Sequence, residues 1–156
     1  MGEMALEAGD RAPDFTLASN AGKVTRADLK GRPYVVYFYP KDNTSGCTKE
    51  ALDFTAAAKK FEKLGLFVLG VSKDSLESHE KFKAKHRLKI ALGSDPKTKM
   101  AQDWDVWGEK TLYGRKYMGM ERATFLVDGK GVIAEAWHKV KVPGHVNAVL
   151  ERAKSL

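Results

Sequence analysis

The sequence has one cysteine, Cys47, among its 156 residues. A chain with one cysteine cannot form a disulfide within itself, so any disulfide must be made with another molecule. A thiol–disulfide oxidoreductase is disfavoured for the same reason, because no Cys-x-x-Cys pair is present. A free thiol is typical of the reducing cytosol, and we therefore expect a cytoplasmic protein.

Long apolar runs are also missing, since none approaches the roughly 20 residues of a membrane span. The N-terminal residues MGEMALEAGD lack the basic start and apolar stretch of a signal peptide. We therefore expect no membrane partner. The four histidines, His79, His86, His138 and His145, show no ligand spacing and have no cysteine partner, so we expect no metal site and no cofactor.

The chain is basic, with 27 Lys and Arg against 20 Asp and Glu, and a formal charge of +7. Such a charge could attract nucleic acid or an acidic protein. The charges are interspersed, however, and no aromatic RNA-binding motif is present, so we expect no nucleic-acid partner. The locally basic run from Lys81 to Lys89 is interpreted as a solvated face, with docking of an acidic reductase as the alternative.

The first half of the chain predicts a βαβ unit. The β-branched and aromatic run Tyr34–Tyr39 stops at Pro40 and is typical of a buried central strand. Apolar residues at helical spacing predict a helix from about Cys47 to Leu64, ended by Gly65. A second apolar run, 66–72, predicts a strand parallel to the first.

The second half predicts a helix capped by Ser75, a hairpin and a terminal helix. An Asp-Gly pair at the turn joins the two hairpin strands. The expected ranges are 75–86 for the capped helix, 91–92 for a short strand, 96–104 for a short helix, 123–127 and 132–140 for the hairpin, and 143–154 for the last helix. With residues up to Leu29 as an N-terminal extension, this order is that of an α/β, thioredoxin-like fold. It predicts a central mixed sheet flanked by helices, in a single domain over residues 1–156.

The environment of Cys47 favours a reactive thiol. Thr44 is a good N-cap residue, which places Cys47 in the first turn of a helix, where the dipole is positive. Gly46 leaves room for a small ligand to approach the backbone. A helix N-terminus stabilises a nearby anion by only about 0.3–1 kcal/mol. Even full ionisation of Cys47 would raise its thiolate fraction only roughly thirteenfold near neutral pH. Because enzymes accelerate reactions about a millionfold or more, a catalyst built on Cys47 must also polarise its substrate.

At this point the residues resemble a known family. Pro40-x-x-x-Thr44-x-x-Cys47 after an apolar strand is similar to the peroxidatic motif of the peroxiredoxins. The segments FYPKDNTSGCTKEA, GVSKDSLESHEKF, LGSD and YGRKYMGMERATFLVD extend the resemblance to the peroxiredoxin Q, or bacterioferritin comigratory protein, subfamily. The resemblance covers the chain from about Gly9 to Leu150.

The resemblance implies a role for each matching position. Cys47 would attack the peroxide O–O bond and become a sulfenic acid. Thr44 would hydrogen-bond the peroxide, Pro40 would shield the site from water, and Arg122 would contact both thiolate and peroxide. Backbone N–H groups near Gly46 and Cys47 would stabilise the developing negative charge.

Three positions depart from the family pattern. Ser45 replaces a proline that many members carry, which leaves the loop slightly more flexible. Leu52 and Lys83 occupy the two positions where subfamily members place a resolving cysteine. The sequence therefore resembles a one-cysteine peroxiredoxin whose sulfenic acid needs an external thiol from thioredoxin, glutaredoxin or glutathione. The resemblance implies a monomer, with a dimer linked through Cys47 as a product of oxidation.

Several alternatives stay open. Out of this context, Cys47 would be an inert buried residue. Glu50 is a substrate-site candidate that either orients Arg122 or favours the helix start. Trp107 is interpreted as a packing residue that lies near the site. The rival function is a redox sensor on the same fold, in which oxidised Cys47 passes its oxidation to a partner.

Overall fold

The computed structural model describes residues 5–156. The first four residues of the expected N-terminal extension, where the signal-peptide argument begins, lie outside the described residues. The strands are β1 (Thr16–Ser19), β2 (Gly22–Thr25), β3 (Tyr34–Phe38), β4 (Phe67–Ser72), β5 (Ala91–Ser94), β6 (Trp107–Leu112), β7 (Arg115–Met120), β8 (Ala123–Val127) and β9 (Ile133–Trp137). The helices are η1 (Ala27–Leu29), α1 (Ser45–Ala56), α2 (Ala58–Lys63), α3 (Leu76–His86), α4 (Lys99–Asp103) and α5 (His145–Ala153).

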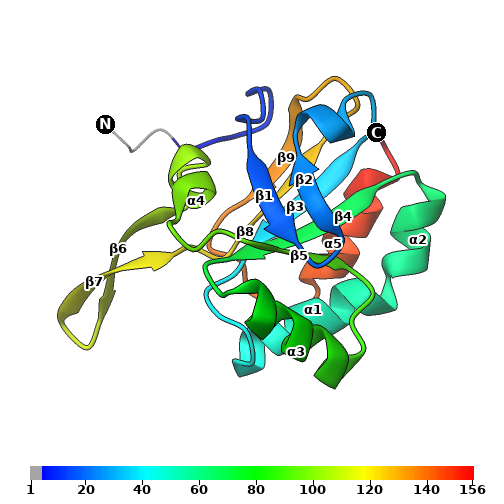
Figure 1. Ribbon diagram of the computed structural model, residues 1–156. Helices are drawn as coiled ribbons and strands as arrows, with labels where there is room; N and C mark the ends of the chain where they lie inside the picture. The colour runs from blue at the N-terminus through cyan, green and yellow to red at the C-terminus, as the bar shows by residue number, and fades with distance from the viewer. Residues whose placement is uncertain (1–4) are drawn as a thin grey trace.

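Within residues 5–156, seven of the nine strands form one sheet in the order β2-β1-β5-β4-β3-β8-β9, and β6 and β7 pair separately (Figure 1). Strands β3, β4 and β5 are parallel to one another, whereas β8 runs antiparallel to β3 and β9 antiparallel to β8. The predicted central mixed sheet is therefore confirmed. The expected N-terminal extension is a hairpin, β1–β2, that joins the sheet through β5.

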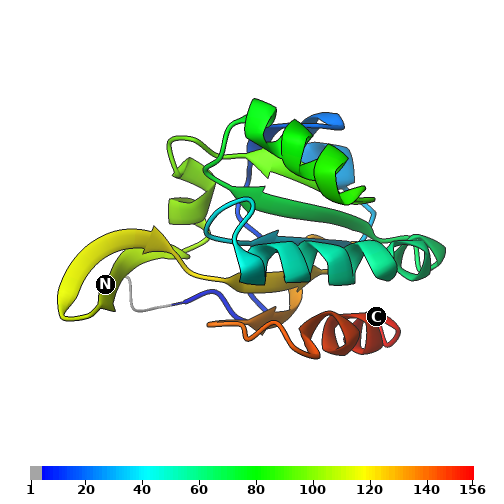
Figure 2. The ribbon, with the colours of Figure 1, turned by 90° about the horizontal axis from the view of Figure 1, so that it is seen from below.

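The central strand β3 separates two hydrophobic cores because its side chains alternate between the two faces of the sheet. Val35, Tyr37 and Tyr39 face a core that also contains residues of α1, α2, α3 and α5. Val36 and Phe38 face a core that includes α4 and the N-terminal hairpin. Figure 2 shows α1 between α3 and α5 on the first of these faces. Burial on both faces explains why the strand is an uninterrupted apolar run.

Most of the elements predicted from local signals are present. The strand over 34–39 and the hairpin strand over 123–127 appear as β3 and β8. Ser75 caps α3, since its Oγ accepts from the Ser78 N–H at 3.1 Å. The boundaries of the last helix differ, because Gly144 has a left-handed φ of 76° and delays the start from Pro143 to His145.

The prediction of one helix from Cys47 to Leu64 was wrong, because two helices meet at Ala57. The Ala57 N–H is shared between the carbonyls of Asp53 and Phe54, each at 3.2 Å, and its ψ is 0°. Phe54 and Phe61 both pack in the core on either side of the break, where their ring centroids lie 6.0 Å apart. The apolar spacing alone could not reveal a one-residue break.

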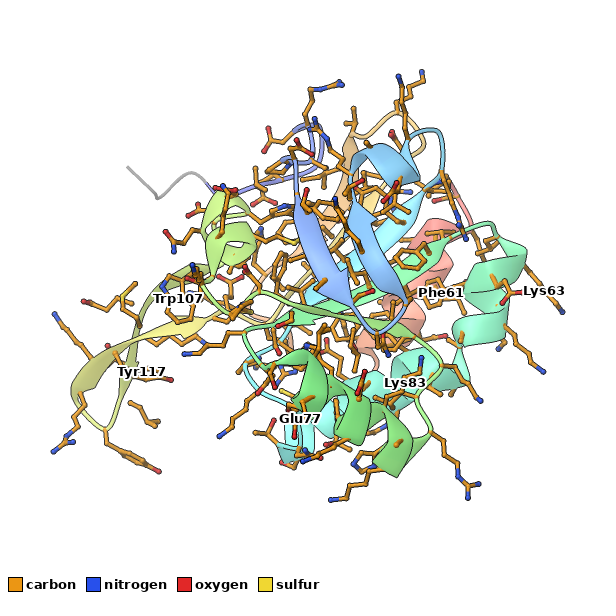
Figure 3. All side chains as sticks on the ribbon, in the orientation of Figure 1. Phe61, Lys63, Glu77, Lys83, Trp107 and Tyr117 are labelled. Atoms are coloured by element: carbon orange, nitrogen blue, oxygen red, sulfur yellow. The ribbon has the colours of Figure 1, made fainter. Side chains whose placement is uncertain are left out.

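The sequence did not predict the hairpin of β6 and β7, which extends from one side of the body (Figure 1). Its tip is a two-residue turn, Tyr113-Gly114, in which both residues have a positive φ, 52° and 76°. Tyrosine is not a turn former, and the strands are rich in charge, so neither signal of a hairpin was present. Figure 3 shows Trp107 and Tyr117 on this hairpin.

Within the described part of the chain, no helix is both long and apolar enough to cross a membrane.

Candidate active site

Cys47 lies in the first turn of α1, at the end of the loop that follows β3. Thr44 is the N-cap residue, and Cys47 is three positions further on. The amide groups of a first helical turn lack partners within the helix and present a positive dipole end. Cys47 is only 1% exposed. The helix terminus therefore places a buried sulfur in an electropositive position.

The prediction that the Thr44 side chain caps α1 was wrong. Its hydroxyl donates to the carbonyl oxygen of Lys41 at 3.1 Å and makes no capping hydrogen bond. This bond uses the hydroxyl hydrogen, so the lone pairs of the Thr44 oxygen remain available to accept from a ligand. The position of Thr44 was predicted correctly, but its side chain is turned back along the loop.

Arg122 joins Cys47 to Glu50. Its Nη2 donates to Cys47 Sγ at 3.2 Å, and its Nη1 donates to Glu50 Oε1 at 2.7 Å. Burial opposes the charge of the guanidinium, but the neighbouring Glu50 and Cys47 raise the pKa of Arg122. Arg122 precedes β8, whose residues pair with β3, so the sheet brings together residues that are 75 positions apart in sequence.

Gly46 lies directly against this guanidinium. A Cβ at position 46 would be 3.2 Å from Nη2 of Arg122, closer than most carbon contacts. The absence of a side chain therefore admits Arg122 to the sulfur. The sequence singled out Gly46 for the approach of a ligand, and in the structure its neighbour is the arginine.

Glu50 is fully buried, and burial raises its pKa to about 7 despite the opposing effect of Arg122. The pKa values of the two partners are set by different effects. Burial outweighs Arg122 in raising the pKa of Glu50, whereas the nearby anions outweigh burial in raising the pKa of Arg122. Glu50 lies beyond the first turn of α1, and its contact is with Arg122. Of the two interpretations that the sequence left open, the geometry favours orientation of Arg122.

Pro40 follows β3 and faces the hairpin of β6 and β7 across a cleft. It lines a cleft of about 400 Å³ together with Trp107, Lys110 and Tyr117 of the β6–β7 hairpin. A second cleft, about 640 Å³, runs beside it from the hairpin to Arg122. The hairpin thus borders the approach to the site, as was expected for Trp107.

Two further residues near Arg122 were not singled out by the sequence. Burial lowers the pKa of Lys110, which lies on β6 and carries a positive charge beside the site. Burial, and then Arg122, lowers the pKa of His145 to about 4, so its ring is neutral at pH 7. Its Nε2 is 2.8 Å from the hydroxyl of Thr124. Lys110 could not be found, because the hairpin that carries it was not predicted.

The described residues provide no group of metal ligands at this site. Among residues 5–156, no three His, Cys, Asp or Glu side chains are grouped so that they could hold a metal ion. Cys47 accepts a hydrogen bond from the Arg122 guanidinium and lies at the N-terminus of α1, whereas the Glu50 carboxyl contacts the guanidinium. Such an arrangement stabilises a thiolate and presents hydrogen-bond donors to an incoming oxygen atom.

The fold and this site define a class of protein, the thioredoxin-like thiol peroxidases. A model of the AhpC/TSA family matches residues 8–136, and the chain belongs to that family. Within it, the chain is similar to the putative peroxiredoxin bcp of Coxiella burnetii, at 46% identity over 96% of this chain and 99% of the relative. It is 45% identical to the peroxiredoxin Bcp of Bacillus subtilis, over 98% of each chain.

Solved structures give the same result. The bacterioferritin comigratory protein of Xanthomonas campestris superposes with a TM-score of 0.89 at 42% identity, over 95% of this chain and 98% of the other. A cysteine-to-serine mutant of Xanthomonas campestris peroxiredoxin Q also has a TM-score of 0.89 and 42% identity, over 96% and 99% of the two chains. The predicted thioredoxin-like fold and the resemblance to the peroxiredoxin Q subfamily are confirmed.

Proposed function

We propose that this chain is a one-cysteine peroxidase that reduces hydrogen peroxide and small organic hydroperoxides with electrons from an external thiol. The contact that carries the proposal is the 3.2 Å hydrogen bond from Arg122 Nη2 to Cys47 Sγ. It supplies the fixed cation and donor that the helix terminus alone does not provide. The clefts beside Pro40 and Arg122 leave room for an organic group, and the Xanthomonas campestris relative is described with alkyl peroxide reduction activity.

The oxidative step is attack of the Cys47 thiolate on one oxygen of the peroxide. The S–O bond forms as the O–O bond breaks, and the departing oxygen takes a proton to become water or an alcohol. Arg122 stabilises the negative charge that moves from sulfur to the departing oxygen. Thr44 orients the peroxide by accepting a hydrogen bond from the peroxide's O–H group, since its own hydroxyl hydrogen is bonded to the Lys41 carbonyl.

The reductive step requires another molecule, because Cys47 is the only cysteine of the chain. A first thiol condenses with the sulfenic acid, releasing water and leaving a mixed disulfide. A second thiol then attacks this disulfide and restores the Cys47 thiol. Because Cys47 is 1% exposed, the first turn of α1 must open before a protein thiol can reach the sulfur. The same requirement applies to a Cys47-linked dimer.

The proposal is tested by treating the reduced protein with one equivalent of hydrogen peroxide and trapping sulfenic acid with dimedone. Mass spectrometry should show one adduct per chain, located on Cys47. The Cys47→Ser variant should form no adduct and consume no peroxide. Either signal persisting in this variant would refute Cys47 as the nucleophile.

The source of electrons is tested by peroxide turnover with a panel of reductants. Thioredoxin with its reductase, and glutathione with and without glutaredoxin, are supplied in separate assays at equal peroxide. At least one reductant should sustain many turnovers per chain. Oxidation of Cys47 once, without turnover by any thiol in the panel, would instead favour the redox-sensor alternative.

A further inference from the structure

A buried polar cluster lies outside the contact between Cys47 and Arg122. Asp42 belongs to the loop between β3 and α1, and His79 to α3. The two side chains are 1% and 0% exposed, and His79 Nδ1 is 2.8 Å from Asp42 Oδ2. The cluster therefore joins α3 to the loop that leads directly into the first turn of α1.

Both ring nitrogens of His79 have buried polar partners. Nδ1 faces the Asp42 carboxylate, and Nε2 is 2.9 Å from the carbonyl oxygen of Gly93. The ring therefore joins Asp42 to α3 and to β5, and neither nitrogen is left without a partner.

Further donors complete the coordination of the Asp42 carboxylate. The Tyr39 hydroxyl donates a hydrogen bond to Asp42 Oδ1 at 2.6 Å, and the Ser78 hydroxyl donates one to Asp42 Oδ2 at 2.8 Å. Burial opposes ionisation of Asp42, but the hydrogen bonds from His79 and Tyr39 outweigh it and lower the pKa. The anion therefore has three side-chain partners, two from α3 and one from Tyr39, the residue that follows β3, and the network is fully satisfied.

The backbone of the same loop residue is also anchored. The Asp42 N–H donates to Asp74 Oδ2 at 2.9 Å, and Ser72 donates to that same oxygen at 2.7 Å. The next residue, Asn43, has a left-handed φ of 65°, a conformation that asparagine adopts more readily than most residues. Thr44, the N-cap of α1, follows at once.

We propose that Asp42 and His79 are positioning residues for the peroxide step, which fix the loop that places Thr44 and Cys47 relative to Arg122. The inference rests on the proposed peroxidase function. Without the pair, the loop loses its hydrogen bond to His79 and is held to α3 only through Ser78, so the peroxide is held less closely in line between Thr44 and Arg122. Misplacement of a reacting group by about 1 Å can cost about 10²-fold in rate.

The test compares Asp42→Asn and His79→Gln with the matched controls Asp103→Asn and His86→Gln. Asp103 is in an exposed pair with a lysine, and His86 lies on the same helix as His79. For each variant, the rate constants of reduced Cys47 with hydrogen peroxide and with iodoacetamide are measured at one pH. Alkylation reports the access to the thiolate and its abundance, but it needs no peroxide alignment.

We expect Asp42→Asn and His79→Gln to lower the peroxide rate constant by about 10- to 100-fold while alkylation stays equal or rises. The controls should leave both rates unchanged. The double variant should be no slower than the slower single variant, because both substitutions break one pair. A peroxide rate equal to that of the wild type in folded variants, or an equal fall in both rates, would overturn the positioning role.

Tyr39→Phe provides a milder variant, should removal of the pair unfold the protein. It deletes only the hydroxyl that donates to Asp42, and we expect a smaller fall of the peroxide rate in the same direction. Failure of the proposed function is distinguishable, because the wild type itself would then not react with peroxide at Cys47.

Discussion

The stability of the Glu50→Gln variant relative to the wild type should rise with pH, although the substitution removes the charge of a buried ion pair. Glu50 is 0% exposed, and its Oε1 accepts from Arg122 at 2.7 Å. Its Oε2 is buried and has no hydrogen-bond partner among the residues that the structure describes. Burial therefore raises the pKa of Glu50 from its ordinary value of 4.5 to about 7, against the attraction of Arg122.

The sign of the effect follows from proton linkage. Between pH 4.5 and pH 7 the folded chain binds more protons at Glu50 than the unfolded chain does, so stability falls as the pH rises. One pKa unit corresponds to about 1.36 kcal/mol, and the full loss is therefore about 3 kcal/mol. This contribution is complete below pH 4.5 and is lost as the pH rises through 7. Glutamine resembles the protonated carboxyl but cannot titrate, so the variant does not undergo this loss.

Urea unfolding of the reduced wild type and of Glu50→Gln, repeated from pH 4.5 to pH 8.5, measures the effect. Relative to their difference at pH 4.5, the variant should gain about 3 kcal/mol over the wild type at pH 8.5. Glu135→Gln is the matched control, because Glu135 pairs with Arg152 at 3.2 Å but is 43% exposed. Such surface pairs contribute about 0–1 kcal/mol, so its difference from the wild type should vary little with pH. A constant difference for Glu50→Gln, or a gain by the wild type, would show that Arg122 outweighs burial.

Three further predictions concern the site and its support. Arg122→Lys keeps the charge but cannot donate from one planar fork to both Cys47 and Glu50, so stopped-flow rates with hydrogen peroxide should fall by about 10²-fold or more. A fall that only matches the change in thiolate content would contradict the role of Arg122 in polarising the peroxide. Gly46→Ala puts a Cβ 3.2 Å from Nη2 of Arg122 and should slow the same reaction by roughly 10-fold with unchanged unfolding by urea; an unchanged rate would show that Arg122 adapts. Phe54→Ala, at a fully buried ring, should cost about 3–5 kcal/mol in urea unfolding, and a loss below about 1 kcal/mol would show that the core collapses to fill the space.

Local sequence patterns predicted those features of the fold that depend on neighbouring residues. The apolar run of β3, the capping serine of α3 and the Asp-Gly turn before β9 each act within a few positions. The β6–β7 hairpin was missed because its turn and its strands carry no such local signal. The break at Ala57 was missed because the apolar spacing continues across it, as it would in one unbroken helix.

The candidate site divides in the same way. The sequence placed Cys47 in the first turn of a helix after Thr44, because both positions depend on one loop and one helix start. It named Arg122 only through the resemblance to a family, since no local pattern links residues 75 positions apart. The contact itself requires β8 to pair with β3.

The sequence alone determined that Cys47 has no partner cysteine within the chain, and hence that an external molecule must supply any second thiol. Only the tertiary structure decided the charges around the sulfur. Burial sets the pKa of Glu50, Arg122 reaches sulfur beside a glycine, and Asp42 is paired with His79. These effects depend on distance and on exclusion of water, which arise only when the sheet and its helices have assembled.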